Sequence, residues 1–184
     1  DFHFIKLYLT GKYHFTLFLM KLISRIVLLL LLVLVLAQCR KDEASPVVNI
    51  PDENFLNALI ELGVDTDGDG KISPEEAEAI ISLDVSEKYI SDMTGIEAFV
   101  NLDYLICYDN LLARLDISNN IALTVLNCSQ NPLNSLDVST NMKLKRLDCF
   151  GTQLSSIDVS NNTCLEELLC SGNKLSTLDV TVYK

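Results

Sequence analysis

A short segment that recurs every 21 residues dominates the second half of the sequence. Its four copies begin at positions 115, 136, 157 and 178, and each consists of an aliphatic residue, an aspartate, a second aliphatic residue and a serine or threonine. A second segment alternates with it at the same spacing and ends in a cysteine, at Cys107, Cys128, Cys149 and Cys170. A fixed period of about 20 to 50 residues indicates a stack of similar units, each of which buries its apolar face against its neighbours. This period restricts the possible folds more than any local propensity does.

The pattern inside one period identifies the type of repeat. One repeat reads Leu-x-x-Leu-x-Cys-x-x-Asn-x-Leu from Leu123 to Leu133, and a similar pattern, Leu-x-x-Leu-x-Val-x-x-Asn, starts again at Leu133. Leucines at these spacings followed by an asparagine match a leucine-rich repeat, in which each period contributes one short strand. We therefore predict an α/β repeat fold, a leucine-rich-repeat solenoid of short parallel strands over residues 82–184. Because the chain stops at Lys184 directly after a repeat, we expect this solenoid to be C-terminally incomplete.

The N-terminal part of the sequence has the features of an export signal. The chain does not begin with methionine, so we interpret residues 1–19 as an upstream extension and Met20 as the natural start. Two basic residues then precede an unbroken run of 12 apolar residues, 26–37. A membrane span needs about 20 apolar residues, whereas the core of a signal peptide has about 7–15. The run therefore predicts a signal peptide over residues 20–38, with a buried core helix as the alternative.

The residues at the end of this run carry a lipidation signal. Leu36-Ala37-Gln38-Cys39 resembles the lipobox of bacterial lipoproteins, and this resemblance implies that Cys39 becomes the lipidated first residue. The charged residues 40–43 that follow resemble the tether of surface-exposed lipoproteins in some Gram-negative bacteria. We therefore predict a short polar tether over residues 39–49 and a lipid anchor that holds the protein to the outer membrane or cell surface.

Residues 50–81 predict a helical cap built around an acidic loop. Asp52 is placed to cap a first helix with regularly spaced apolar residues, and a second helix is expected over residues 75–81. The 12 residues between these helices match the calcium loop of an EF-hand. The ligands at loop positions 1, 3, 5, 7, 9 and 12 would be Asp65, Asp67, Asp69, the carbonyl of Lys71, Ser73 and Glu76.

Calcium is the ion that this loop is expected to bind. Ca²⁺ takes about six to eight hard oxygen ligands, and four carboxylates this close together would repel one another without a cation. We therefore predict a Ca²⁺ site that holds the cap in shape, because the end of a solenoid needs a capping element. Sensor EF-hand loops usually occur in pairs in which one loop braces the other, whereas this sequence contains one loop. A calcium-sensing switch and a metal-free acidic turn are the alternatives.

The region from residue 50 to residue 180 as a whole resembles a bacterial protein family. Ile50-Pro51-Asp52-Glu53-Asn54-Phe55, the acidic loop and the segment Ile90–Phe99 precede the repeats in the order typical of secreted or surface bacterial leucine-rich-repeat proteins with 21-residue nested repeats. The resemblance implies a cap followed by a solenoid, and surface binding or adhesion as the function. This sequence departs from the family pattern at Thr152, which replaces the asparagine present at 110, 131 and 173.

Composition disfavours two classes of function. The formal charge is −11 overall and, because residues 1–38 contribute +3, −14 in the remainder. A surface this acidic disfavours binding to nucleic-acid phosphates. Both histidines, His3 and His14, lie in the leader, and the sequence offers no nucleophile–base pair, so we predict that the protein is not an enzyme.

The outward face of the predicted sheet is the candidate binding surface. Its candidate ligand-binding residues are Tyr104, Tyr108, Arg146 and Phe150. Aromatic residues with scattered charges on a rigid sheet suit a protein or glycan ligand, so we predict a surface recognition or adhesion protein. The alternatives are an ordinary solvated face and a passive surface spacer that displays a missing C-terminal domain.

The recurring cysteines are expected to point inward on successive coils, about 4.8 Å apart. Reduced cysteine behaves as a small apolar residue, so a buried ladder of thiols is the predicted arrangement. Disulfides between neighbours are the alternative in an oxidising compartment, although stacked side chains do not have disulfide geometry by default. Cys164 lies outside this ladder. We expect the recurring aspartates to accept hydrogen bonds from neighbouring hydroxyl or backbone groups; they are Asp116, Asp137, Asp158 and Asp179.

Overall fold

The computed structural model describes residues 22–23, 25 and 46–179. The chain divides into two units, residues 1–45 and 46–184. In the first unit the three described residues are helical. The predicted upstream extension, nearly all of the signal peptide and the lipidation residue Cys39 lie outside the described residues. Within the described part, no helix is long and apolar enough to cross a membrane.

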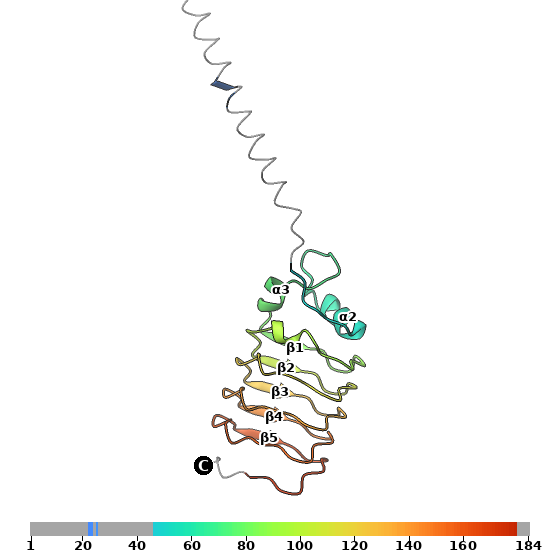
Figure 1. Ribbon diagram of the computed structural model, residues 1–184, viewed down its shortest axis with the longest axis vertical. Helices are drawn as coiled ribbons and strands as arrows, with labels where there is room; N and C mark the ends of the chain where they lie inside the picture. The colour runs from blue at the N-terminus through green and yellow to red at the C-terminus, as the bar shows by residue number, and fades with distance from the viewer. Residues whose placement is uncertain (1–21, 24, 26–45, 180–184) are drawn as a thin grey trace, which may run out of the picture. The chain divides into compact units, whose positions relative to one another are not determined.

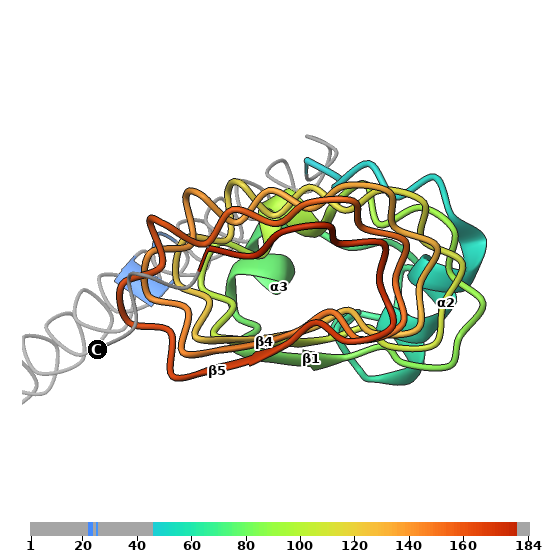
Figure 2. The same ribbon diagram turned by 90° about the horizontal axis from the view of Figure 1, so that it is seen from below.

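The second unit is a stack of coils with one strand per coil (Figure 1). The strands pair in parallel in chain order, and they are β1 Ser82–Asp84, β2 Tyr104–Ile106, β3 Val125–Asn127, β4 Arg146–Asp148 and β5 Glu167–Leu169. The register places Leu105, Leu126, Leu147 and Leu168 side by side at the predicted spacing of 21 residues. Leu83 pairs with Leu105, 22 residues later. Viewed along the stack, the coils superimpose with the strands on one long side (Figure 2), which confirms the predicted solenoid.

Leucines and cysteines fill the inside of the coils. In β2, β3 and β4 the central leucine is fully buried, and so is the cysteine that follows each strand, at Cys107, Cys128 and Cys149. Cys170, after β5, is half-buried, and all described cysteines are free thiols. The predicted inward ladder is therefore confirmed, in reduced form.

Asparagines satisfy the backbone groups inside the turns. The Asn131 amide nitrogen donates to the carbonyls of Cys107 (2.9 Å) and Cys128 (3.1 Å), so one side chain joins two coils. Asn120, Asn141 and Asn162 make similar cross-coil bonds on the opposite side. Buried main-chain carbonyls need hydrogen-bond donors. These asparagines supply donors in turns that lack the hydrogen bonds of a helix or a strand, so the carbonyls of the turns can be buried.

The recurring aspartates hold the exposed turns. The first oxygen of each carboxylate accepts a hydrogen bond from the backbone N–H two residues later, at Ser118, Ser139 and Ser160. The hydrogen bonds from these serines lower the pKa of Asp116, Asp137 and Asp158, which stay ionised. For these three aspartates, the prediction that they accept hydrogen bonds from neighbouring groups is confirmed.

A helix–loop–helix stands on the first coil. Helix α2, Glu53–Glu61, buries Phe55, Ala58 and Leu59, and helix α3, Pro74–Glu78, follows the acidic loop. Helix α3 ends three residues earlier than the expected second helix, and strand β1 begins at Ser82. The Ile81 carbonyl accepts hydrogen bonds from the N–H groups of Asp103 (2.8 Å) and Tyr104 (3.2 Å) in the next coil. A 3-10 helix, η2 Ile96–Ala98, opens the turn that leads to β2.

Asp52 connects this cap to the first coil. One carboxylate oxygen accepts hydrogen bonds from the backbone N–H groups of Asn54 and Phe55 and so caps α2, as predicted. The other accepts from the N–H and hydroxyl of Ser91 (2.9 and 2.7 Å) and from the N–H of Asp92 (3.1 Å). A single side chain therefore fixes the entry of α2 and its position on the repeats.

Candidate functional site

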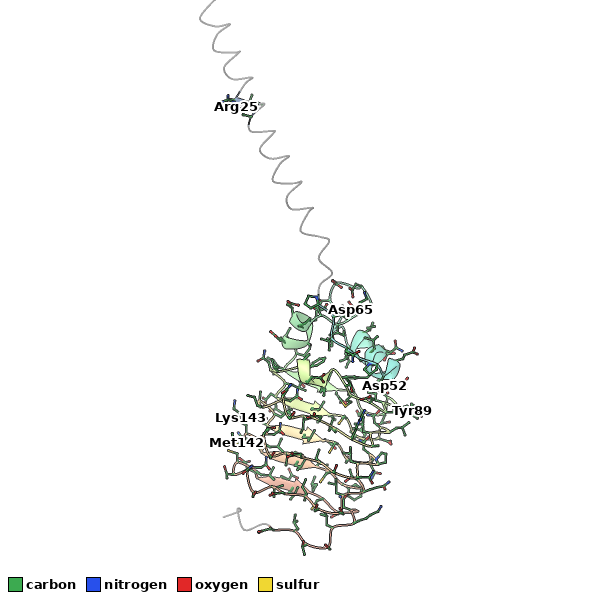
Figure 3. The ribbon with its side chains drawn as sticks, in the orientation of Figure 1. Arg25, Asp52, Asp65, Tyr89, Met142 and Lys143 are labelled. Atoms are coloured by element: carbon green, nitrogen blue, oxygen red, sulfur yellow. The ribbon has the colours of Figure 1, made fainter. Side chains whose placement is uncertain are left out.

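The acidic loop between α2 and α3 brings three of its carboxylates together. Asp65, Asp67 and Glu76 each offer an oxygen, and these oxygens lie within 4.8 Å of one another. Oxygens that bind one Ca²⁺ at about 2.3–2.6 Å lie at most about 5 Å apart, so the cluster fits this ion. Asp69 is not part of the cluster, and its Oδ1 accepts a hydrogen bond from the backbone N–H of Lys71 (2.8 Å). Asp65 lies in the loop at the cap end of the unit (Figure 3).

Two glycines allow the loop to turn around Asp65. Gly68 and Gly70 have φ of +75° and +79°, a left-handed conformation that residues with a Cβ rarely adopt. In this conformation their N–H groups donate to Oδ1 and Oδ2 of Asp65, at 2.8 and 2.9 Å. The hydrogen bonds fix both oxygens of the first predicted ligand, and the loop geometry therefore depends on glycine at positions 4 and 6.

Glu76 ties the two ends of the loop together. Its Oε1 accepts hydrogen bonds from the N–H and hydroxyl of Thr66, both at 2.7 Å, and its Oε2 accepts from the N–H of Ser73 at 2.9 Å. The Ser73 backbone and the Thr66 side chain lower the pKa of Glu76 to about 2, so the carboxylate is ionised at neutral pH. The Ser73 oxygen in turn accepts from the N–H of Glu76, which completes the predicted capping box of α3.

The outward face of the sheet holds the four candidate ligand-binding residues. Tyr104 and Arg146 stand in one column, two coils apart, and Tyr108 and Phe150 follow strands β2 and β4 in the same way. The side chains of Tyr104 and Phe150 are exposed, at 44% each. The Tyr108 hydroxyl donates to a carboxylate oxygen of Glu87 (2.7 Å), and Arg146 forms an ion pair with Glu167. The sheet thus places these residues on one face, each pair about 10 Å apart along the stack.

A column of left-handed residues borders this face and was not predicted. Residues 87, 109, 130, 151 and 172, one per coil, all have positive φ, and the last two are glycines. A Cβ on Gly151 would lie 2.8 Å from the side-chain nitrogen of Gln130, and one on Gly172 would lie 3.5 Å from the Phe150 ring. The two glycines, 21 residues apart, are the sequence signal that could have revealed this corner of each coil.

Sequence reasoning also missed a shallow cleft on the turns away from the sheet. It has a volume of about 400 Å³ and includes Asp92, Glu97, Arg114 and Asp116. The Arg114 guanidinium lies 3.6 Å from the Asp92 carboxylate and remains largely exposed. No periodic signal marks this cleft, because serines occupy the position of Arg114 in the following two coils, at 135 and 156.

Comparison with known proteins agrees with this geometry. No family model matches the chain. Internalin J of Listeria monocytogenes is 40% identical over 70 residues, which are 38% of this chain and 8% of that protein. The solved functional domain of InlJ from Listeria monocytogenes, which includes a cysteine ladder, superimposes with a TM-score of 0.67 at 39% identity and covers 72% of this chain and 29% of the other. The chain has an internalin-like fold.

A more distant structure supports the same fold. Internalin InlF of Listeria monocytogenes superimposes with a TM-score of 0.59 at 21% identity and covers 77% of this chain and 49% of that one. The chain spans less than a third of the InlJ structure and about a twelfth of Internalin J. Like the InlJ domain, this chain carries a cysteine ladder inside its coils.

Proposed function

We propose that this protein is a cell-surface recognition or adhesion module that binds a protein or glycan through the outward face of its sheet. The observation that carries this proposal is the gathering of three aromatic side chains and an arginine on one rigid face: Tyr104, Tyr108, Phe150 and Arg146. Aromatic and arginine side chains supply much of the binding energy at interfaces, and a sheet fixed by parallel hydrogen bonds loses little freedom on binding. An enzymatic activity is not part of the proposal.

The acidic loop is proposed to hold one Ca²⁺ ion that stabilises the cap. Asp65, Asp67 and Glu76 would bind it, and their oxygens already lie within 4.8 Å of one another. The ion supplies the positive charge that offsets the mutual repulsion of these carboxylates. The remaining predicted ligands, Asp69, the carbonyl of Lys71 and Ser73, stay proposals for the same site.

Anchoring is proposed to take place through a lipid on Cys39, at the outer membrane or cell surface. Support for this step comes from the sequence, where Leu36-Ala37-Gln38-Cys39 follows the apolar run. The wild-type protein should then partition with membranes, whereas Cys39→Ala should remain unprocessed. Secretion of a soluble wild-type protein that is cleaved elsewhere would overturn the lipid anchor and leave the binding face untouched.

The binding face is tested with variants on and off the sheet. The full chain would be applied to an array of purified glycans and a panel of extracellular-matrix proteins. We expect Tyr104→Ala/Phe150→Ala to weaken binding to each hit by at least about tenfold, the usual effect of removing two central aromatic contacts. Met142→Ala is the matched control, because Met142 is 62% exposed but lies in the turn before β4 (Figure 3).

The same experiment separates recognition from the second candidate, a passive spacer. A spacer would give no hit on either panel, although its fold is intact by circular dichroism. Hits that both variants retain equally would place recognition outside the sheet face.

A further inference from the structure

The backbone just before the cap is attached to the middle of the acidic loop. The N–H of Val48 donates a hydrogen bond of 2.8 Å to the carbonyl of Ile72. Ile72 is the eighth residue of the loop, its side chain is 1% exposed, and it lies between the proposed ligands Lys71 and Ser73. The sequence assigned Val48 to the polar tether, whereas here it is half-buried and packs on the core.

The other side of this segment lies against the first coil. Gly95 has φ of +105°, and a Cβ built there would lie 2.6 Å from Cγ1 of Ile50 and 3.0 Å from the carbonyl oxygen of Asn49. Ile50, like Val48, packs against the buried core. Gly95 precedes η2, whose Ile96 belongs to that core. Residues 48–50, which we name the brace segment, therefore lie between the acidic loop and the lead-in to the repeats.

The hydrogen bond between the Val48 N–H and the Ile72 carbonyl holds the part of the loop backbone that carries two of the proposed calcium ligands. The carbonyl of Lys71 and the side chain of Ser73 are proposed ligands, and both are attached to the backbone that the Val48 hydrogen bond holds. If the brace segment leaves, the Ile72 carbonyl loses the hydrogen bond from the Val48 N–H. This loss disfavours the loop conformation.

We propose that the brace segment takes the place of the second loop of an EF-hand pair, so that calcium binding and the docking of residues 48–50 stabilise each other. This inference rests on the calcium site of the proposed function. Linkage is reciprocal: a docked brace segment raises the affinity of the loop for calcium, and calcium lowers the fraction of molecules in which the segment is undocked by the same factor. Calcium binding would thus hold the C-terminal end of the predicted tether against the cap.

The direct test measures amide hydrogen exchange of the full chain with and without calcium. We expect calcium to slow exchange at the Val48 amide about three- to tenfold, together with exchange at the loop amides of Gly68 and Gly70. This range corresponds to the net contribution of about one hydrogen bond. Protection of Gly68 and Gly70 without any change at Val48 would overturn the brace and leave the calcium site intact. No calcium binding by titration calorimetry, and no change at any of these amides, would overturn both.

A substitution tests the reverse direction of the linkage. Val48→Pro removes the donor N–H, and we expect it to weaken calcium affinity about three- to tenfold in calorimetry. Val47→Pro is the matched control, because the neighbouring Val47 side chain is 50% exposed. Val48→Ala keeps the N–H and separates the hydrogen bond from side-chain packing. Equal calcium affinity in Val48→Pro and Val47→Pro would overturn the proposal. If Val48→Pro does not fold, the exchange of the wild-type Val48 amide decides.

Discussion

At the scale of single residues, the buried cysteines of the ladder should differ from an exposed cysteine in the pKa and the reactivity of their thiols. Burial raises the pKa of Cys107 and Cys149 to about 12 and that of Cys128 well above its ordinary value. These thiols are therefore neutral and inaccessible in the folded protein. We expect a maleimide at pH 8 to label Cys164 at once and half-buried Cys170 more slowly, and to label the other three only after denaturation. Peptide mass spectrometry assigns the sites, and fast labelling of Cys128 in the native state would contradict the coil register.

The same thiols predict the sign of an alkaline effect on stability. Each raised pKa means that the folded protein retains a proton that the unfolded chain releases near its ordinary value of 9.0. The stabilisation is complete below that pH and is lost as the pH rises toward 12. The melting temperature should therefore fall as the pH rises from 9 toward 12, and Cys128→Ala should reduce the slope. Cys164→Ala should leave it unchanged.

Thr152 offers a second prediction at the residue scale. In the preceding coil Asn131 donates to two carbonyls and accepts from the N–H of Leu112 (3.0 Å), whereas the Thr152 hydroxyl reaches the Cys149 carbonyl and the Asn173 side chain. Thr152→Asn should restore a donor for Cys128 and an acceptor for Leu133, and stabilise the fold by about 0.5–1.5 kcal/mol in urea unfolding. A loss of stability on this change would show that the hydrogen bond between Thr152 and Asn173 stabilises the fold more than the two hydrogen bonds that an asparagine would form with Cys128 and Leu133.

At the scale of elements, Asp52 determines whether the cap unfolds together with the repeats. Its partial burial opposes ionisation, but the hydrogen bonds from Ser91, Phe55 and Asp92 outweigh this and lower its pKa. Asp52→Ala removes the cap of α2 and the bonds to the first coil, so we expect a loss of about 1–3 kcal/mol and an earlier transition for the cap. Asp52→Asn keeps an acceptor and should lose less. Glu53→Ala, an exposed neighbour, should change little, and a single unshifted transition in Asp52→Ala would contradict the role of this contact.

The elements also show how far the sequence could be read. The inward leucines and cysteines, the Asp52 cap and the Ser73–Glu76 capping box follow from spacings of a few residues or of one period, so they were predictable. The bond between Val48 and Ile72 joins residues whose proximity depends on how the segment before the cap docks on the loop. Neither residue type nor spacing marks it. Asp69 lies outside the carboxylate cluster, and its Oδ1 accepts a hydrogen bond from the Lys71 N–H, which loop position alone does not reveal.

At the scale of the whole molecule, the stability of the repeats should depend on calcium at the cap. Extracellular calcium modules bind with Kd near about 10⁻⁴–10⁻³ M. Calcium at ten to a hundred times Kd would add about 1.4–2.7 kcal/mol to the free energy of unfolding. In a solenoid each coil is stabilised by its neighbours, and the cap is joined to the first coil through Asp52 and through the strand pairing of Leu83 with Leu105. The added stability should therefore spread along the stack.

The measurement is a calcium titration of thermal unfolding, followed both by circular dichroism and by labelling of Cys149, which lies three coils beyond the first coil. We expect calcium to raise the melting temperature and to delay the labelling of Cys149, and Asp65→Ala or Glu76→Gln to abolish both effects. Because the folded pKa of Glu76 is about 2, below its ordinary 4.5, its contribution is present above pH 4.5 and is lost only as the pH falls toward 2. The calcium effect should accordingly persist at pH 5.5. If calcium binds while the exposure of Cys149 on heating stays the same, the loop is an independent module and does not cap the solenoid.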